Sequence, residues 1–428
     1  MPTTTALAPL VALLARPLRD PKLRRRLLGA ATAAYLLYYI NSVRRIKLHF
    51  GHGDRAASER IKRIIDCCPT LARVYWPTFF APHAIGQILL LGLKEMRARL
   101  SPSPYERTLL RLTDGTHIAL DWATPEEPLD DGSGPVCVLL HGAFQDASSV
   151  TMIDLAVGFV KRGMPTVVMN RRGYGGLPIA EGSKLSVFGF DEDLDLVLQQ
   201  VGRRFPGRCV ALIGFSCGAG FSCRYAHTRG ALSAWAGGEA KPKPSVGATL
   251  PRLLCTVCYD PGYNVGWEGA VSRIAPPYSW ALVAALKYVY VYRHRDALSK
   301  RSPSSLELCT QLLSPRLGLR QTYRGLRRLS GAGDSSAWLE MQQPRIEESV
   351  MPTLLLNSVD DPVTRWENVE EARAEIAGNP NCVLAELRRG AHGCKFGFLG
   401  RQTMAEPIIA EFVLGAWREL QRQATEQS

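Results

Sequence analysis

The sequence predicts an α/β protein whose mostly parallel sheet carries helices on both faces. The chain has 428 residues, of which 46% are hydrophobic, so it is long and apolar enough to bury a large core. From about residue 105 onward, short β-branched runs alternate with segments of helical periodicity, as in a parallel sheet. Several runs are apolar at every position, as expected of strands covered on both sides. This composition excludes a collagen, a coiled coil and a multi-span membrane protein.

Eight runs are predicted to be strands, and the first two flank Asp114-Gly115, a pair typical of hairpin turns. Their bounds are Thr108–Leu112, Ile118–Trp122, Val136–Leu140, Thr166–Met169, Cys209–Ile213, Leu253–Tyr259, Thr353–Asn357 and Cys382–Leu387. Helices are predicted where apolar residues recur at spacings of three and four. These residues are Met152, Ile153, Ala156, Phe159 and Val160, then Leu194, Val197, Leu198 and Val201. A closing helix is expected to begin at Pro407.

The chain is expected to divide into five segments. They are a basic N-terminal segment (1–53), a helical lead-in (54–104), the first part of the α/β core (105–261), a helical lid after the sixth strand (262–345) and the second part of the core (346–424). Within the lid segment, Trp280–Tyr292 is too short to cross a bilayer and is interpreted as a lid helix or an ordinary core helix. Residues 229–250, rich in Gly, Ala, Pro and Lys, are predicted to form a surface loop.

The positive charge is concentrated at the N-terminus. Residues 1–53 hold +8 of the net +13, on both sides of an uncharged run at 27–43. This run is predicted to be a transmembrane anchor helix, with Tyr35, Tyr38 and Tyr39 at the headgroups, which implies a single-pass membrane protein. The alternative is an organellar transit peptide that is cleaved off. No zinc-finger spacing, basic zipper or basic stripe interleaved with aromatics is present, so nucleic acid is not an expected partner.

The cysteines do not indicate a metal site or a disulfide framework. There are 11 of them, an odd number scattered along the chain, which favours a reducing compartment. Cys255 and Cys258 form a single C-x-x-C pair inside an apolar run, so they are interpreted as buried strand residues. No metal and no cofactor are expected.

A nucleophile is predicted at Ser216. The strand Cys209–Ile213 runs into G-F-S-C-G at 214–218, so the motif G-x-S-x-G lies between a strand and a helix. A serine in such a sharp turn takes strained backbone angles, and Gly214 and Gly218 supply the room that side chains would deny. The turn also aims a helix N-terminus at the hydroxyl, where it favours developing negative charge.

A serine hydroxyl needs a base, and the base needs an orienting acid. His392 follows the strand Cys382–Leu387 in a turn of small residues, and it is the expected base. Asp361 follows the strand Thr353–Asn357 and is the preferred acid because it stands directly before a proline. Asp360 is the second choice and Asp260, after the sixth strand, is the third.

The oxyanion hole is expected in the turn after Val136–Leu140, from the backbone N–H groups of Ala143 or Phe144 together with that of Cys217. His141 and Asp146 also form H-x-x-x-x-D, a spacing known from acyltransferases. The Arg171-Arg172-Gly173 turn is interpreted as structural, with binding of an anionic headgroup as the alternative.

These motifs together resemble the YheT-like branch of the α/β-hydrolase superfamily, which includes membrane-anchored ABHD-type lipases and esterases. The resemblance covers roughly residues 65–420. It rests on P-T-F-F…H-A-I-G-Q at 77–87, D-G-T-H-I-A-L-D-W at 114–122, H-G-A-F at 141–144, N-R-R-G-Y at 170–174, G-F-S-C-G at 214–218, D-D-P at 360–362 and G-A-H-G at 390–393. The chain departs from the family at Tyr174, where a small polar residue is common, and in the long 229–250 loop.

The resemblance implies the α/β-hydrolase fold and a serine hydrolase of carboxylic esters, often lipid esters, with the triad Ser216, Asp361 and His392. The expected reaction passes through an acyl-enzyme, and the expected partners are an acyl-ester substrate and the membrane. One alternative is an acyltransferase that passes the acyl group to an alcohol through the same triad. Another is a non-catalytic, membrane-bound lipid-binding or scaffold protein that keeps the fold.

Overall fold

One large sheet organises the chain. The computed structural model describes residues 20–235, 250–266, 269–300, 302–329 and 343–427. Within these residues a nine-stranded sheet has the order β2-β11-β10-β9-β8-β6-β7-β5-β4. The strands from β7 through β6, β8, β9 and β10 to β11 pair in parallel, whereas β2, β5 and β4 pair antiparallel at the edges. The mostly parallel sheet of the prediction is therefore confirmed.

The strands of this sheet match the eight predicted runs to within two residues at each end. Their bounds are β2 Lys47–Phe50, β4 Glu106–Arg111, β5 His117–Ala123, β6 Val136–Leu140, β7 Thr166–Asn170, β8 Val210–Phe215, β9 Leu253–Tyr259, β10 Thr353–Ser358 and β11 Cys382–Leu387. Strand β2 is not predicted by the sequence, because its four residues include a lysine and a histidine and show no apolar run. A separate two-stranded sheet pairs β1 (Arg44–Arg45) with β3 (Val74–Tyr75).

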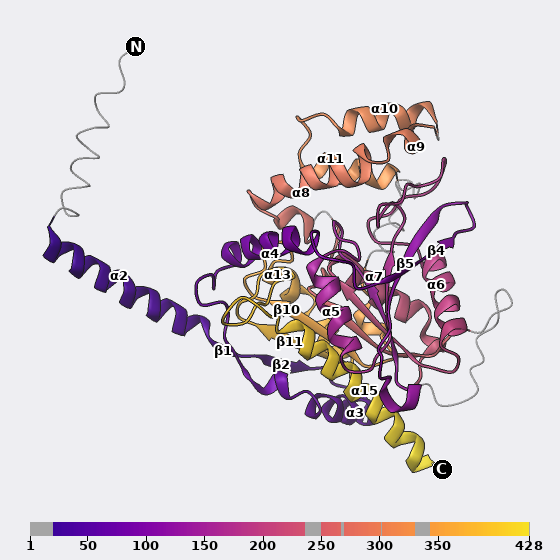
Figure 1. The fold of residues 1–428 in the computed structure, drawn as a ribbon, viewed down its shortest axis with the longest axis horizontal. Coiled ribbons are helices and arrows are strands. Elements are labelled where there is room, and N and C mark those ends of the chain that lie inside the picture. The colour runs from indigo at the N-terminus through magenta and orange to yellow at the C-terminus, as the bar shows by residue number, and fades with distance from the viewer. Residues whose placement is uncertain (1–19, 236–249, 267–268, 301, 330–342, 428) are drawn as a thin grey trace.

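Helices cover both faces of the sheet (Figure 1). The helices are α2 Pro21–Ser42, α3 Arg55–Asp66, α4 Ala84–Ala98, α5 Val150–Val160, α6 Asp191–Arg204, α7 Cys217–Thr228, α8 Tyr278–Leu286, α9 Arg295–Ser299, α10 Pro303–Leu312, α11 Leu319–Leu329, α13 Trp366–Glu371, α14 Arg373–Gly378 and α15 Ala405–Gln427. Helices α3, α5 and α15 pack on one face, and α6 and α7 on the other. Side chains of β6 alternate between the two cores, because successive residues of a strand point to opposite faces. The fold is that of an α/β-hydrolase.

Helices α8, α9, α10 and α11 lie outside these two layers (Figure 1). They share a small core with the segment after β7, which contributes Tyr174, Ile179 and Leu185, and Tyr290 and Val291 are buried in it. The run Trp280–Tyr292 continues from α8 into a π-helical turn at Lys287–Tyr292. Within this run Trp280 is 70% exposed while Tyr290 is buried, so the run is partly surface and partly core, and its role as a lid stays a prediction.

The N-terminal anchor prediction is supported only in part. The helix is present as α2, which projects away from the sheet in Figure 1. Among the described helices, however, none has both the length and the apolar character that crossing a bilayer requires. The transmembrane span expected over 27–43 is therefore not supported: the uncharged part of α2 includes three tyrosines and Asn41, and its first turns carry Lys22 and three arginines. A single-pass membrane localisation is accordingly not supported. The transit-peptide alternative stays a prediction.

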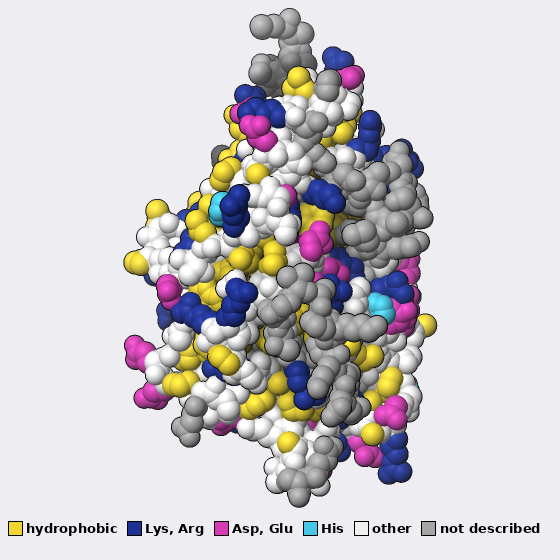
Figure 2. Space-filling model, turned by 90° about the vertical axis from the view of Figure 1, so that its right-hand side faces the viewer, with side chains coloured by type: hydrophobic (Ala, Val, Ile, Leu, Met, Phe, Trp, Pro, Cys, Tyr) yellow, Lys and Arg dark blue, Asp and Glu magenta, His cyan; other side chains and the backbone are white. Residues whose placement is uncertain are grey.

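The remaining sequence expectations concern the cysteines and the surface. All 11 cysteines are free, and Cys255 and Cys258 are buried in β9, as predicted. Acidic and basic side chains are interspersed over the described part of the face in Figure 2. Residues 236–249 of the predicted 229–250 loop lie outside the described residues.

Candidate active site

Ser216 occupies the sharp turn between β8 and α7. Its φ is 55°, in the left-handed region that costs a non-glycine residue free energy, and α7 begins at the next residue. The flanking glycines make this turn feasible. A Cβ atom at Gly214 would lie 2.1 Å from the carbonyl oxygen of Gly218, and one at Gly218 would lie 2.1 Å from that of Leu140. Both positions therefore require glycine.

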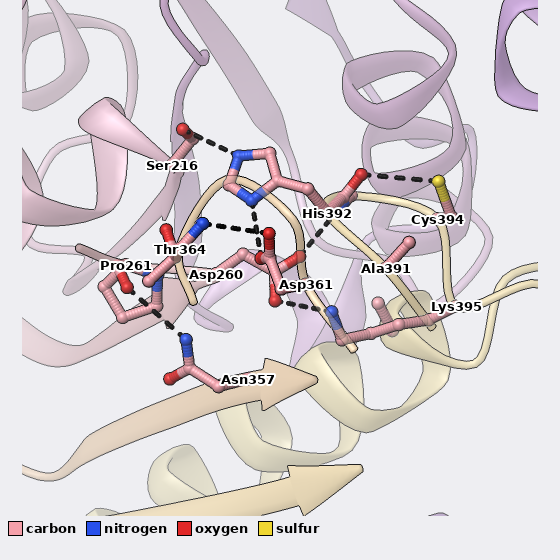
Figure 3. A network of polar contacts seen from close by, with 12 residues as sticks. Ser216, Asp260, Pro261, Asn357, Asp361, Thr364, Ala391, His392, Cys394 and Lys395 are labelled. Carbon is pink, nitrogen blue, oxygen red and sulfur yellow. Dashed lines mark hydrogen bonds and ion pairs between the residues drawn. The ribbon is translucent and has the colours of Figure 1, made fainter. Parts of the chain in front are cut away.

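The side chains of Ser216, His392 and Asp361 form a continuous hydrogen-bonded series (Figure 3). The Nε2 atom of His392 lies 2.9 Å from Oγ of Ser216, and its Nδ1 atom lies 2.7 Å from Oδ2 of Asp361. The three residues follow β8, β10 and β11, parallel strands whose carboxyl ends share one edge of the sheet. The imidazole is 13% exposed and Asp361 is fully buried.

Asp361 is fixed by the turn that carries it. Its Oδ1 atom accepts hydrogen bonds from the backbone N–H groups of Val363 (2.7 Å) and Thr364 (2.9 Å), which leaves Oδ2 for the imidazole. The neighbouring Asp360 instead accepts from the N–H of Ala391, one residue before the histidine. Of the two adjacent aspartates, only Asp361 contacts the ring, while Asp360 holds the loop.

Asp260, the third choice for the acid, also supports the histidine loop rather than the ring. Its Oδ2 atom accepts from the N–H of Gly393 at 2.7 Å, and its Oδ1 atom pairs with Nζ of Lys395 at 2.5 Å (Figure 3). Both side chains of this ion pair are 0% exposed. The sequence reasoning missed Lys395. The available signal was a lysine among small and apolar residues directly after G-A-H-G.

Asp260, Asp361 and His392 offer ligand atoms within 4.8 Å of one another, which is close enough for a metal ion. These atoms already have protein partners, namely Lys395, the backbone of the acid and histidine loops, and Ser216. The buried lysine also neutralises Asp260. We therefore interpret the group as a hydrogen-bonded network and not as a metal centre.

The electrostatics of the site suit a proton acceptor at His392. Burial lowers the pKa of the imidazole, but the charge of Asp361 and its hydrogen bond raise it by more, so the net pKa lies above the ordinary value. Burial raises the pKa of Asp260, against the opposing charge of Lys395. Near neutral pH the site therefore favours a histidine that can take up and hold a proton.

The segment His141–Phe144, called the oxyanion loop here, follows β6. The N–H groups of Ala143, Phe144 and Cys217 donate to no other group in the part of the chain that the structure describes. Three predicted donors are thus free for a ligand atom, and Cys217 is the first residue of α7.

The H-x-x-x-x-D spacing does not form a second acid–base pair. His141 is fully buried, its Nδ1–H donates to the carbonyl of Gly142 (2.8 Å), and its Nε2 accepts from the N–H of Arg171 (3.2 Å). Burial lowers the pKa of this imidazole well below its ordinary value. Asp146 is engaged with Ser148. His141 is therefore a structural residue of the oxyanion loop.

Phe215 is a further residue that the sequence reasoning missed. Its ring packs against that of His392, with centroids 5.2 Å apart. A Cβ atom at Gly142 or at Gly393 would lie less than 3 Å from the Phe215 ring. This phenylalanine therefore spaces the oxyanion loop from the histidine loop, and glycines on both sides let it fit.

Comparisons with known proteins find a family, curated relatives and solved structures to which this chain is similar. The family described as serine aminopeptidase S33 matches residues 133–238. The human phospholipase ABHD3 is 23% identical over 401 residues, covering 89% of this chain and 88% of the relative. The zebrafish (Danio rerio) monoacylglycerol lipase ABHD2 is 22% identical over 381 residues, covering 85% and 84%. A solved 2,6-dihydroxy-pseudo-oxynicotine hydrolase has a TM-score of 0.47 at 15% identity, covering 78% of this chain and 73% of that one.

Proposed function

We propose that this chain, an α/β-hydrolase similar to the ABHD-type lipases, cleaves carboxylic esters of lipid acyl chains through an acyl-enzyme on Ser216. The observation that carries the proposal is the hydrogen-bonded series from Ser216 through His392 to Asp361 beside free backbone donors. No group other than these protein residues is needed for the steps below.

In the first half-reaction, Nε2 of His392 takes the proton of Ser216 as Oγ attacks the ester carbonyl carbon. The carbonyl oxygen becomes an oxyanion, which accepts hydrogen bonds from the N–H of Ala143 or Phe144 and from that of Cys217. When the C–O bond to the leaving group breaks, His392 gives its proton to the departing alcohol. Asp361 holds the Nδ1–H tautomer and stabilises the imidazolium throughout.

In the second half-reaction, water replaces the alcohol. His392 takes a proton from the water as its oxygen attacks the acyl carbon, and the same backbone donors stabilise the second oxyanion. The bond to Oγ of Ser216 then breaks, the serine regains its proton from His392, and the fatty acid leaves. One ester and one water give one acid and one alcohol.

Lipid esters are the proposed substrates because ABHD3 and ABHD2 are named as a phospholipase and a monoacylglycerol lipase. We also propose that the described helices of the 262–345 segment act as a lid. Their position outside the two layers that cover the sheet supports this role, as does the hydroxyl of Tyr290, which donates to the carbonyl of Ala143 at 2.9 Å. This contact joins the segment to the oxyanion loop. The bounds of this lid, residues 262–345, are likewise proposed.

The test compares the wild type with Ser216→Ala. We expect a fluorophosphonate probe to label only the wild type, and lipid extracts incubated with the wild type to lose acyl esters and gain fatty acids. Equal labelling of both proteins, or none of either, would contradict the proposal and favour a lipid-binding scaffold. If an added alcohol receives the acyl group in preference to water, the protein is an acyltransferase.

A further inference from the structure

Arg171 is a buried cation that has no acidic partner among the residues that the structure describes. It is 2% exposed and directly follows β7. Its Nε and Nη1 atoms are buried and have no hydrogen-bond partner among the described residues. Burial lowers the pKa of its guanidinium, and the groups that raise this pKa are the thiol of Cys217 and the phenols of Tyr174 and Tyr290, not carboxylates. A guanidinium stays protonated in proteins, so this is a buried positive charge.

The adjacent Arg172 shows what an ordinary structural arginine looks like in this chain. Its guanidinium pairs with both carboxylate oxygens of Asp193, at 2.6 and 2.7 Å, and also contacts Asp114. The anionic-headgroup interpretation of the pair therefore fails for Arg172, whose charge is already neutralised. Arg171 differs in that nothing in its described surroundings neutralises it.

Burying an unpaired charge costs several kcal/mol, so its presence needs an explanation. Arg171 lies between the two chain segments that supply the free backbone donors. Its Nη2 atom donates to the carbonyl of Gly142 at 2.9 Å and lies 3.5 Å from Sγ of Cys217. The negative partner that this position suits is one that forms only during the reaction, the oxyanion between Ala143 and Cys217.

The contact with Gly142 has a direct geometric consequence. The C=O of Gly142 and the N–H of Ala143 belong to one trans peptide group, so they point in opposite directions. Arg171 and Nδ1 of His141 both donate to this carbonyl and fix its direction. The Ala143 N–H therefore points to the other side of the peptide, where it has no partner among the described residues. A charged donor on the C=O also polarises the peptide and strengthens its N–H as a donor.

We propose that Arg171 is a positioning residue for the oxyanion hole: it orients and polarises the Gly142–Ala143 peptide and supplies the positive charge that the oxyanion meets. This inference rests on the proposed ester hydrolysis at Ser216. Arg171 acts through the peptide and does not touch the substrate. Its contribution is therefore realised when the carbonyl oxygen gains charge, and is small when the neutral ester binds.

The test separates charge on the oxyanion from binding of the neutral ester. It measures kcat and KM for a soluble short-chain p-nitrophenyl ester, and inhibition by a trifluoromethyl ketone of the same chain, which forms a hemiketal oxyanion with the serine. For Arg171→Met we expect kcat/KM and ketone affinity to fall together, by roughly 10- to 100-fold, below the ~100- to 1,000-fold effect of deleting a donor outright. KM should change by less than about threefold.

Arg172→Met is the matched control, since it removes a neighbouring arginine whose charge is neutralised. We expect it to lower the melting temperature while the affinity for the ketone and the KM for the ester stay near their wild-type values. If Arg171→Met does not fold, Arg171→Lys is the alternative variant. It keeps the positive charge but not the planar guanidinium, and should lower kcat/KM and ketone affinity by one common, smaller factor.

Three outcomes would decide against Arg171. They are unchanged ketone affinity in Arg171→Met, a fall in kcat/KM that the ketone does not share in either Arg171 variant, and a loss of ketone affinity relative to the change in KM that is the same in the Arg171 and Arg172 variants. If the ketone does not inhibit the wild type and a fluorophosphonate does not label it, the proposed function itself is overturned instead. The two failures are thus distinguishable.

Discussion

The buried Asp260–Lys395 pair provides the sharpest test of how the histidine loop is held. Lys395→Met keeps most of the side-chain volume but leaves the carboxylate of Asp260 with the N–H of Gly393 as its remaining partner. Breaking a fully buried ion pair in this way costs about 3–5 kcal/mol. Since domains have only about 5–15 kcal/mol of stability, we expect a folded but marginal variant.

The loss should depend on pH. Burial raises the pKa of Asp260, and without the opposing charge of Lys395 the folded-state pKa rises further above the unfolded value of about 3.9. Stability from a raised pKa is fully present below the unfolded value and is lost as pH rises through the folded value. Lys395→Met should therefore be least impaired in acid and most impaired near neutral pH.

Urea unfolding of the wild type and the variants at pH 5 and pH 8 measures both effects. The double variant Asp260→Asn/Lys395→Met carries no charge at this site and keeps an oxygen for the Gly393 N–H, so it should recover most of the loss. A Lys395→Met protein as stable as the wild type at pH 8, or a double variant no better than the single one, would refute the reasoning.

The same pair acts on the catalytic base. The pKa of His392 is set first by burial, which lowers it, and then by Asp361 and Asp260, which raise it, against Lys395. Asp260→Asn removes one raising charge and leaves Lys395 uncompensated, so the pKa of His392 should fall. The acid limb of the kcat/KM profile then moves to lower pH. An unmoved limb would show that the pair supports only the loop.

Three further predictions concern the rest of the site. Asp361→Asn should lower kcat by roughly 10³- to 10⁴-fold and shift the acid limb to lower pH, because the charge that raises the pKa of His392 is lost; a pH–rate profile checks both. Gly218→Ala places a Cβ 2.1 Å from the carbonyl oxygen of Leu140 and should prevent stable folding, seen as loss of a cooperative melt, whereas a wild-type melting temperature would contradict the turn geometry. Tyr290→Phe removes the hydroxyl that donates to the carbonyl of Ala143 in the oxyanion loop and should raise the activation free energy by about 1 kcal/mol, several-fold in kcat/KM, with the melting temperature nearly unchanged; identical kinetics would argue against a link between the helical segment and the loop.

The sequence predicted the sheet well because its strands are short, apolar and unambiguous. The run Val136–Leu140 has no polar position, and the structure buries all of it. Strand β2 escaped prediction because an edge strand needs only one covered face and its pairing with β11 is visible only in space. The transmembrane prediction for α2 is not supported, because a count of uncharged residues ignored how polar the tyrosines and the asparagine of this helix are.

Local sequence by itself determined the turn at Ser216, since Gly214 and Gly218 are the residues whose absent side chains allow it. It also placed candidate acids and the histidine directly after strands, which is enough to put them at one edge of a parallel sheet. What the tertiary structure alone decided is which charges meet there. The choice between adjacent aspartates, the pairing of Asp260 with Lys395 and the lack of a carboxylate partner for Arg171 among the described residues depend on distances of a few ångströms between segments far apart in the chain. Electrostatic energies vary steeply over those distances and with burial, and neither quantity is written in the order of the residues.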